Sequence, residues 1–281
     1  MDFLADMSAS SRARVAAARA VTPDEALRAQ LRALPAAPAL RLSGLGFDLI
    51  AEVKLRSPAL GQLKDASEDV AARVADYAAA GAAAISVLTE PTRFDGSLPH
   101  LSQAVDALRA QAHTVPVMRK DFIVDPYQLY EARLAGAGGA LIILRMLARA
   151  ELAALLECSA ELGLFALLEA FDAADLALAG ELVREFAART SLLVGVNCRD
   201  LATLRVEASR FEALAPLLPS GVPCVAESGV VSAADAVRRV REGYDVALVG
   251  GALMQSAAPR ALLRAMLDAG RGEARAHRGA S

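Results

Sequence analysis

Eight short apolar runs, separated by amphipathic helical patterns, follow one another from about residue 48 to residue 250. The runs lie at residues 48–54, 83–88, 115–119, 140–144, 165–169, 192–197, 223–227 and 246–250. Helical patterns lie between them, for example at 69–80, 126–135, 149–162, 173–189 and 232–242. Such alternation predicts parallel βαβ units, and continuous apolar strands are typical of a parallel sheet buried on both faces. The pattern predicts an α/β protein with one TIM (β/α)8 barrel, for which 281 residues suffice.

An open, doubly wound sheet is the alternative arrangement of alternating strands and helices. Such a sheet usually carries a phosphate-binding loop of the GxGxxG or GxxxxGK type after its first strand. Neither motif follows the run at 48–54. We therefore favour the closed barrel.

The first 46 residues and the last eleven differ from the repeating part. Residues 3–20 predict an Ala/Arg-rich amphipathic helix, and a second helix is expected to start with Thr22 as N-cap and Glu25 completing a capping box. We interpret residues 1–46 as a helical extension packed on the barrel and residues 47–270 as the catalytic domain. The Arg- and Ala-rich residues 271–281 are expected to be a disordered tail.

Composition narrows the functional class. Hydrophobic residues make up 55% of the chain and the net charge is -3, without a long basic run, so we expect no nucleic-acid partner. No uninterrupted apolar run reaches the length of a membrane span, and no basic and apolar leader precedes the first helix. The cysteines are odd in number and widely spaced, which favours reduced thiols; they are Cys158, Cys198 and Cys224. We expect a cytoplasmic protein, either a monomer or a weak homodimer.

Lysine is rare in this chain. Of the 30 basic residues, only Lys54, Lys64 and Lys120 are lysine. An ammonium group can give up its proton, whereas a guanidinium effectively cannot. Two of the three lysines end predicted strands, which favours a chemical role over chance.

Polar residues gather at the predicted carboxyl ends of the strands, where barrels of this class have their active sites. Glu52 and Lys54 are two residues apart on the first strand, so they share one face, about 7 Å apart. A structural ion pair is the alternative interpretation of these two residues. The candidate residues at the mouth are Glu52, Lys54, Lys120, Glu169, Asn197, Arg199, Glu227 and Ser228.

Two kinds of loop add to this mouth. Residues 55–68 form a βα loop far longer than the usual length of roughly 2–6 residues, which indicates a mobile lid or a tolerated insertion. The turns after the last two strands contain Ser228, Gly229, Gly250 and Gly251, and each precedes a helix. Small residues before a helix N-terminus are suited to phosphate, although a glycine in a tight turn is common without any ligand.

Several chemistries lack the residues they need. None of the histidines His100, His113 and His277 lies at a strand end, which argues against a Ser-His-Asp triad. No cluster has metal-ligand spacing, so no metal is expected. Cys198 follows Asn197 and should face the other side of the strand, so we expect a packed thiol.

Six strings lie along the predicted strands: IAEVK (50–54), ISVLTE (85–90), PVMRKDFIVDPYQ (116–128), GVNCRDL (195–201), ESG (227–229) and VGGALM (249–254). In these strings the sequence resembles the indole-3-glycerol phosphate synthases of tryptophan biosynthesis. The strings follow in order from the first strand to the last, and the string around Lys120 is highly specific. The N-terminal helices fit the extra helix that this family places over the barrel mouth.

The resemblance implies a lyase, a carboxy-lyase that needs no cofactor. Its phosphorylated small-molecule substrate, 1-(2-carboxyphenylamino)-1-deoxyribulose 5-phosphate, undergoes ring closure, decarboxylation and dehydration. The implied catalytic residues are Lys120 as general acid, Glu169 as base, the pair Glu52 and Lys54, and Asn197. The implied substrate-binding residues are Ser57, Phe94, Phe122, Leu141, Arg199, Leu201 and Glu227, with phosphate at Ser228, Gly229, Gly250 and Gly251. Among other cations in a partly dry mouth, the pKa of Lys120 is expected to be lowered.

This chain departs from the family pattern at Ala59, Gly138, Phe171 and Gly251, which leaves room for altered affinity or a secondary-metabolite pathway. Other phosphate-binding barrels, such as a phosphoribosylanthranilate isomerase or a tryptophan synthase α-like protein, lack the Lys-Asp-Phe block. A silent barrel acting as a binding partner would be expected to lose Lys120 or Glu169, and both are present.

Overall fold

A computed structural model describes residues 3–64, 68–200 and 203–279 of the chain. The strands are β1 (Asp48–Val53), β2 (Arg56–Ser57), β3 (Gly61–Gln62), β4 (Ala84–Leu88), β5 (Val117–Lys120), β6 (Gly139–Ile143), β7 (Phe165–Ala170), β8 (Leu192–Asn197), β9 (Cys224–Glu227) and β10 (Val246–Val249). The first helices are α1 (Phe3–Val21), α2 (Asp24–Leu31), α3 (Val70–Ala80), α4 (Pro91–Phe94), α5 (Leu98–Ala110) and α6 (Pro126–Leu134). The remaining helices are α7 (Arg149–Leu162), α8 (Ala173–Phe186), α9 (Ser209–Leu214), α10 (Ala233–Arg241), α11 (Gly251–Gln255) and α12 (Pro259–Gly279), with single 3-10 turns at Leu144–Met146 and Ala215–Leu217.

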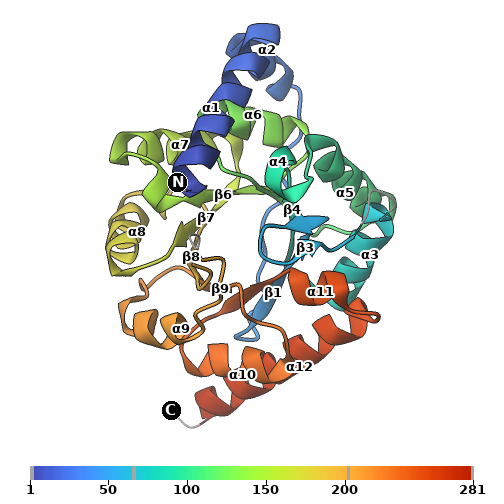
Figure 1. Cartoon of the computed structure of the whole chain (residues 1–281), viewed down its shortest axis with the longest axis vertical. Helices are drawn as coiled ribbons and strands as arrows, with labels where there is room; N and C mark the ends of the chain where they lie inside the picture. The colour runs from blue at the N-terminus through green and yellow to red at the C-terminus, as the bar shows by residue number, and fades with distance from the viewer. Residues whose placement is uncertain (1–2, 65–67, 201–202, 280–281) are drawn as a thin grey trace.

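Eight of these strands close into a parallel barrel, which confirms the predicted fold. The order around the barrel is β1-β10-β9-β8-β7-β6-β5-β4, and helices surround it (Figure 1). Closure is made by β1, which pairs with β10 on one side and with β4 on the other. Each of the eight runs singled out in the sequence forms one of these strands, and Lys120 is the last residue of β5.

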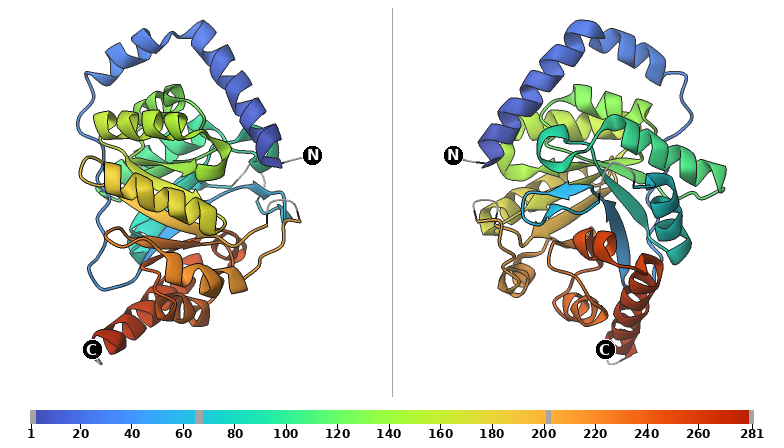
Figure 2. Two further views of the ribbon diagram at one scale, coloured as in Figure 1. Left: turned by 90° about the vertical axis from the view of Figure 1, so that its left-hand side faces the viewer. Right: turned by 45° about the vertical axis from the view of Figure 1, so that its right-hand side comes forward.

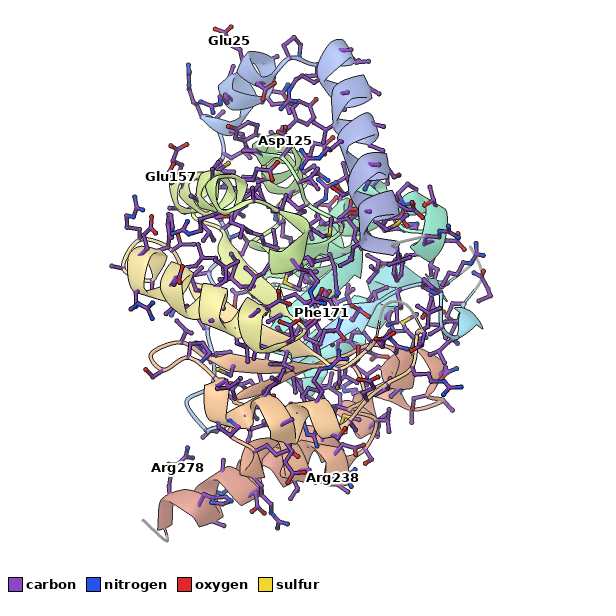
Figure 3. The ribbon with its side chains drawn as sticks, turned by 60° about the vertical axis from the view of Figure 1, so that its left-hand side comes forward. Glu25, Asp125, Glu157, Phe171, Arg238 and Arg278 are labelled. Carbon is purple, nitrogen blue, oxygen red and sulfur yellow. The ribbon has the colours of Figure 1, made fainter. Side chains whose placement is uncertain are left out.

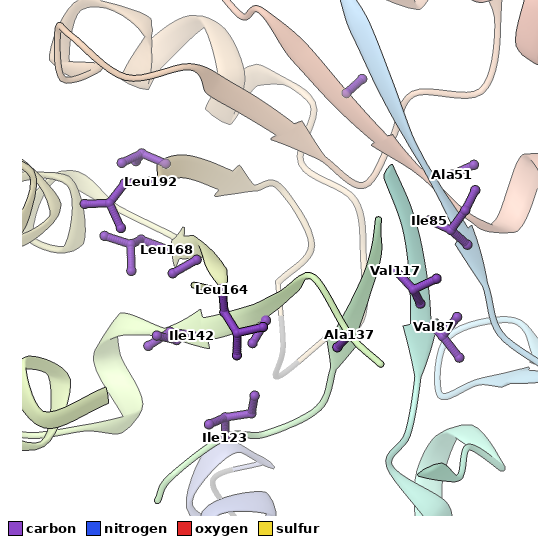
Figure 4. Close-up of a cluster of buried hydrophobic side chains, with 14 of the residues drawn as sticks. Ala51, Ile85, Val87, Val117, Ile123, Ala137, Ile142, Leu164, Leu168 and Leu192 are labelled. Atoms are coloured by element: carbon purple, nitrogen blue, oxygen red, sulfur yellow. The ribbon is translucent and has the colours of Figure 1, made fainter. Parts of the chain in front are cut away.

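Successive side chains of each strand point to opposite faces, which divides the core into two layers. The outward layer, which includes Ile85, Val117, Ile142 and Leu168, packs against the helices (Figure 4). The inward layer fills the barrel below the mouth. It contains Ile50, Met118, Leu141, Leu167, Leu193, Val225 and Leu248. Both layers are apolar, which is why the strands show no strict alternation of apolar and polar residues.

The sequence marks where the helices around the barrel begin and end. Asp69, Asp172 and Ser232 are N-caps, and each accepts a hydrogen bond from the backbone N–H three residues later. Each such cap is worth about 1 kcal/mol. Gly81 and Gly163 end α3 and α7 in the left-handed conformation that a residue with a Cβ rarely adopts.

The N-terminal extension consists of α1 and α2, which form an arch against one side of the barrel (Figure 2). Only the first part of α1 reaches the mouth, where Met7 packs into the inward layer, whereas α2 lies beside α6. Asp125, just before α6, lies under the arch and pairs with Arg19 (Figure 3). The expected Thr22 cap is wrong: Pro23 precedes α2 at the N-cap position, with no side-chain cap.

The expectation of a disordered tail from about Gly270 is also wrong, because α12 continues to Gly279. Gly270 lies directly against the ring of Phe47, where an added Cβ would lie 2.2 Å from Cδ1. The Arg271 Nε donates to the carbonyl oxygen of Phe47 at 3.0 Å, and Ala274 is buried. The small residues that suggested a solvated tail instead let this helix pack closely under the barrel.

The loop after β1 contains a two-stranded hairpin, β2 and β3, which projects over the mouth (Figure 2). This hairpin, residues 56–62, occupies half of the segment 55–68, for which the sequence indicated a lid or an insertion. Its tip, around Pro58, Ala59 and Leu60, faces the barrel mouth and lines the pocket there. Within the described residues, no helix combines the length and the apolar character required to span a membrane.

Candidate active site

The carboxyl ends of the strands surround a pocket of about 410 Å³. Among the residues that line it are Glu52, Lys54, Ser57, Phe94, Lys120, Phe122, Leu141, Glu169, Asn197, Arg199, Glu227, Ser228, Gly229, Gly250 and Gly251. Every candidate site residue that the sequence suggested therefore lies at this one pocket, except Leu201, which falls outside the described residues.

Glu52 and Lys54 form an ion pair at the end of β1. The Lys54 Nζ lies 2.7 Å from the Glu52 Oε1, and both side chains are largely buried. Room for the carboxyl comes from Gly250, where an added Cβ would lie 2.3 Å from the same oxygen. Burial favours a higher pKa for Glu52, but the charges of Lys54 and Lys120 outweigh it and lower the pKa. Glu52 is therefore a carboxylate at neutral pH.

Lys120 is surrounded by carboxyl groups. Its Nζ lies 3.6 Å from the Glu169 Oε1 and 4.0 Å from the Glu227 Oε2. The expectation of a lowered pKa is wrong. Burial by itself would lower the pKa of Lys120, but the charges of Glu169, Glu52 and Glu227 outweigh burial, so the pKa lies above its ordinary value. The expectation failed because the groups nearest to Lys120 are anionic rather than cationic.

Glu227 is the most deeply buried carboxyl group of the mouth. It is 1% exposed, and neither of its oxygens has a hydrogen-bond partner within the described residues. Burial and the neighbouring Glu169 raise its pKa well above the ordinary value, against the opposing effect of Lys120. The protonated form of Glu227 is therefore favoured over a wider range of pH than that of an exposed carboxyl group. Gly195 makes the space for it, since an added Cβ would lie 2.1 Å from the Glu227 Oε1.

Asn197 joins three parts of the mouth. Its Nδ2 donates to the Glu169 Oε1 at 3.0 Å. Its Oδ1 accepts from the backbone N–H of Arg199 and from the Ser228 Oγ, both at 2.9 Å. This amide is therefore fixed in orientation, and it holds Glu169 in turn.

Arg199 adds a positive charge to the mouth; within the described residues it forms no ion pair, although the charge of Glu52 acts on it from a distance. One of its guanidinium nitrogens, Nη1, donates to the carbonyl oxygen of Leu204 at 2.8 Å. Burial lowers its pKa, although an arginine keeps its charge at neutral pH. Because Lys54 and Lys120 face carboxylates, Arg199 is well suited to bind an anionic group of a ligand.

Aromatic rings form one wall of the pocket. The rings of Phe94 and Phe122 lie 6.2 Å apart, and Phe3 meets Phe122 edge-on at 5.8 Å. Phe3 was not among the site residues predicted from the sequence, yet it lines the pocket. An aromatic residue at the start of the extension was the only signal, and its distance in sequence from the strands hid its place. Phe171, which directly follows β7, is buried, and the Arg145 guanidinium carbon lies 4.6 Å from the centre of its ring.

The turns after β9 and β10 form the opposite end of the pocket. Ser228 and Gly229 both have positive φ angles, 68° and 74°, and Gly250 precedes the short α11. The Ser228 hydroxyl already donates to Asn197, so the donors near this end are backbone N–H groups and the Lys54 ammonium, which would lie 3.0 Å from a Cβ added at Gly250. Ser57, on the hairpin, is buried beside the pocket, and its Oγ accepts from the backbone N–H of Ala59.

Cys198 is a packed thiol, as expected. It is fully buried, and burial raises its pKa to about 12, so it is not a nucleophile. In the described part of the chain, no group of three or more His, Cys, Asp or Glu side chains could hold a metal ion.

Comparison with known proteins identifies the family. A family model described as indole-3-glycerol phosphate synthase matches residues 4–266. The chain belongs to the indole-3-glycerol phosphate synthase family. Two relatives of that name, from Rhodococcus opacus and Saccharopolyspora erythraea, are 41% and 45% identical to it. The first alignment covers 92% of each chain, and the second covers 83% of this chain and 81% of the relative.

Solved structures resemble this member of the indole-3-glycerol phosphate synthase family in fold alone. The 3-hexulose-6-phosphate synthase from Salmonella typhimurium is 14% identical, with a TM-score of 0.58 over 81% of this chain and 100% of that one. A tryptophan synthase α-subunit from Pyrococcus furiosus is 15% identical, with a TM-score of 0.56 over 79% and 98%. Both share the barrel fold with this chain.

Proposed function

We propose that this chain converts 1-(2-carboxyphenylamino)-1-deoxyribulose 5-phosphate into indole-3-glycerol phosphate, CO₂ and water. One observation carries the proposal beyond family membership: the Lys120 ammonium lies between Glu169 and Glu227 and borders the aromatic wall. A proton donor, a carboxylate base and an apolar wall are the three features that this sequence of steps requires.

The first step forms a carbon–carbon bond. The aromatic carbon that bears the carboxylate attacks the ketone carbon of the sugar chain, and the ketone oxygen becomes an alkoxide. Lys120 donates its proton to that oxygen, and its charge stabilises the oxygen as negative charge develops. Asn197 supports this step indirectly, because it holds Glu169 beside Lys120.

The second step releases CO₂ and restores the aromatic ring. The electron pair of the breaking carbon–carbon bond returns to the ring. Phe3, Phe94, Phe122 and Leu141 provide an apolar environment in which a carboxylate loses much of its hydration, which favours neutral CO₂. Arg199 holds the anthranilate end of the substrate.

The third step removes water to complete the indole ring. Glu169 takes a proton from the carbon next to the hydroxyl-bearing carbon, and that hydroxyl leaves with a proton from Lys54. The ion pair of Lys54 with Glu52 holds the ammonium at the pocket. Over the cycle Lys120 and Lys54 each give up a proton and Glu169 gains one. Proton exchange among these side chains and one proton taken from solvent restore them, and the proposal includes no cofactor.

The phosphate is assigned to the turns after β9 and β10. Ser228, Gly229, Gly250 and Gly251 border the pocket there, and small residues let an anion approach backbone N–H groups closely. We further propose that the protein works in the cytoplasm, as a monomer or weak homodimer. Residues 1–46 would form its extension and residues 47–270 its catalytic domain.

The proposal is tested by following indole absorbance or fluorescence after the substrate is added. Lys120→Ala and Glu169→Gln are each expected to lower kcat by about 100-fold to 10,000-fold. Lys64→Ala is the matched control, because it removes the remaining lysine side chain, which does not line the pocket. Failure of well-folded wild type to form any indole product would refute the proposal.

A further inference from the structure

One stripe of α1 contacts the segment that follows β5. Phe3, Met7, Ser11 and Arg14 are three or four residues apart, so they lie on the same face of the helix. Phe3 meets the ring of Phe122, and the Ser11 Oγ donates to the carbonyl oxygen of Phe122 at 2.5 Å. This stripe therefore contacts the chain immediately beyond Lys120.

Arg14 makes the strongest of these contacts. Its two terminal nitrogens donate to the two oxygens of Asp121 at 2.7 Å and 3.1 Å. Nη2 also donates to the Ser11 Oγ at 2.7 Å. Such a two-point contact fixes both the position and the rotation of the carboxylate.

Asp121 is the residue through which α1 reaches β5. Its side chain is fully buried, and it also accepts from Thr89, Arg119 and the backbone N–H of Phe122. Burial favours a higher pKa, but Arg119 and Arg14 lower the pKa of Asp121 to about 2, so it is ionised. Among the described residues its orientation depends on Arg14 of α1, on Thr89 after β4, and on Arg119 and the Phe122 N–H at the end of β5, so α1 is the element outside the barrel that holds it.

Lys120 is the last residue of β5, and Asp121 follows it directly. The Lys120 ammonium faces Glu169 and Glu227, whereas the Asp121 carboxylate is bonded to Arg14, Thr89 and Arg119. The two neighbouring side chains are therefore held by different partners. The carbonyl oxygen of Lys120 is held as well, since it accepts from the backbone N–H of Thr89 at 3.0 Å. A shift at Asp121 therefore moves the Lys120 Nζ relative to Glu169 and Glu227.

We propose that Arg14 is a positioning residue for the reaction: through Asp121, it sets the place of the Lys120 ammonium. The inference rests on the function proposed above and assigns to α1 a part in the chemistry. Loss of the Arg14 guanidinium leaves a buried carboxylate without its partner on α1. The end of β5 then shifts, and the Lys120 ammonium is displaced from its position beside Glu169 and Glu227.

The test compares Arg14→Met with Arg12→Met. Both variants remove one positive charge from α1, and Arg12 also pairs with a barrel acid, Glu151, at an exposed site. Arg14→Met is expected to lower kcat by about 10-fold to 100-fold with KM within about 2-fold, because the substrate pocket remains and the acid is displaced. Arg12→Met is expected to keep both constants. Arg14→Lys, which keeps the charge without the two-point contact, should fall between them.

A second readout needs no substrate. The chain has three lysines, so incorporation of lysine labelled with ¹³C at Cε gives three lysine signals, and Lys120→Arg assigns one of them. The Lys120 signal should change its shift and its titration in Arg14→Met and keep both in Arg12→Met. Lack of product from wild type would refute the proposed function and leave this readout intact.

Three outcomes would overturn the inference. One is wild-type kcat with an unchanged Lys120 signal in Arg14→Met. Another is an equal loss of kcat in Arg12→Met and Arg14→Met, which would mean that α1 acts as a cover as a whole. The third is a loss of kcat that disappears when Arg14→Met is assayed well below its melting temperature, which would show a role in stability alone.

Discussion

A methyl group added at Gly195 tests how closely the barrel mouth positions the carboxyl of Glu227. Gly195 lies in β8 with an ordinary strand backbone, so alanine is compatible with its conformation. The added Cβ would lie 2.1 Å from the Glu227 Oε1 and 3.1 Å from a methyl carbon of Leu167. The carboxyl group has to move by about 1 Å to relieve this contact.

We expect Gly195→Ala to lower kcat by about 100-fold, because a displacement of about 1 Å at a catalytic site costs that much. The free energy of unfolding should change by less than about 2 kcal/mol. The clash is with the end of a side chain, and alanine gains about 0.5–1 kcal/mol over glycine within a strand. The assay pairs indole formation with urea unfolding of the same sample.

Gly180→Ala is the matched control, since its nearest neighbour would be an arginine nitrogen at 3.6 Å and it lies on a helix away from the pocket. A second control places Gly195→Ala in a Glu227→Asp background, where the shorter side chain leaves room for the methyl group. There the alanine should cost less than about 5-fold in kcat. Full activity in Gly195→Ala would refute the reasoning, and so would an equal loss in both backgrounds.

Three further outcomes are expected. In α12, Gly270→Ala should destabilise the protein by about 1–2 kcal/mol, because the added methyl group clashes with Phe47. Gly272→Ala, which has no close neighbour, should stabilise the protein by about 1 kcal/mol. Thermal unfolding distinguishes the two signs. The pKa of Asp121 is lowered from 3.8 to about 2. Its contribution to the free energy of unfolding, about 2 kcal/mol, is therefore present above pH 4 and lost as the pH falls toward 2. Asp121→Asn should remove that part of the pH dependence of acid unfolding. The pKa of Glu227 is raised from 4.5, so the stability present below that value is lost as the pH rises toward the folded-state pKa, and Glu227→Gln should lack this loss when unfolding is measured from about pH 4 upward.

The barrel was predictable from the sequence because burial on both faces makes each strand a continuous apolar run. Ile50 faces the interior and Ala51 faces the helices, and both are apolar, so the run is visible without any knowledge of its partners. The same reasoning located the site. In a parallel barrel all strand ends meet at one mouth, so Lys120 and Glu169 could be placed together although they come from different strands.

What the sequence did not reveal depends on contacts between distant segments. The raised pKa of Lys120 comes from carboxyl groups on three other strands, whose distances only the closed barrel sets. Phe3 lies at the pocket because Arg14 and Arg19, further along α1, pair with Asp121 and Asp125. No local sequence pattern predicts these pairs. The ordered end of α12 depends on Gly270 meeting Phe47, two residues 223 positions apart by their numbers.

The raised pKa of Lys120 bears directly on how this lysine can act as an acid. A general acid transfers its proton best when its pKa matches that of the oxygen that receives it. The ketone oxygen is too weak a base to take a proton from Lys120 before the carbon–carbon bond forms. As that bond forms, the oxygen becomes an alkoxide, which is a stronger base than a lysine amine, and the proton then moves readily. Until then the surrounding carboxylates keep Lys120 charged, so it stabilises the developing negative charge throughout the step. An arginine could provide the charge but could not complete the transfer, which accounts for a lysine at this strand end in a chain that otherwise uses arginine.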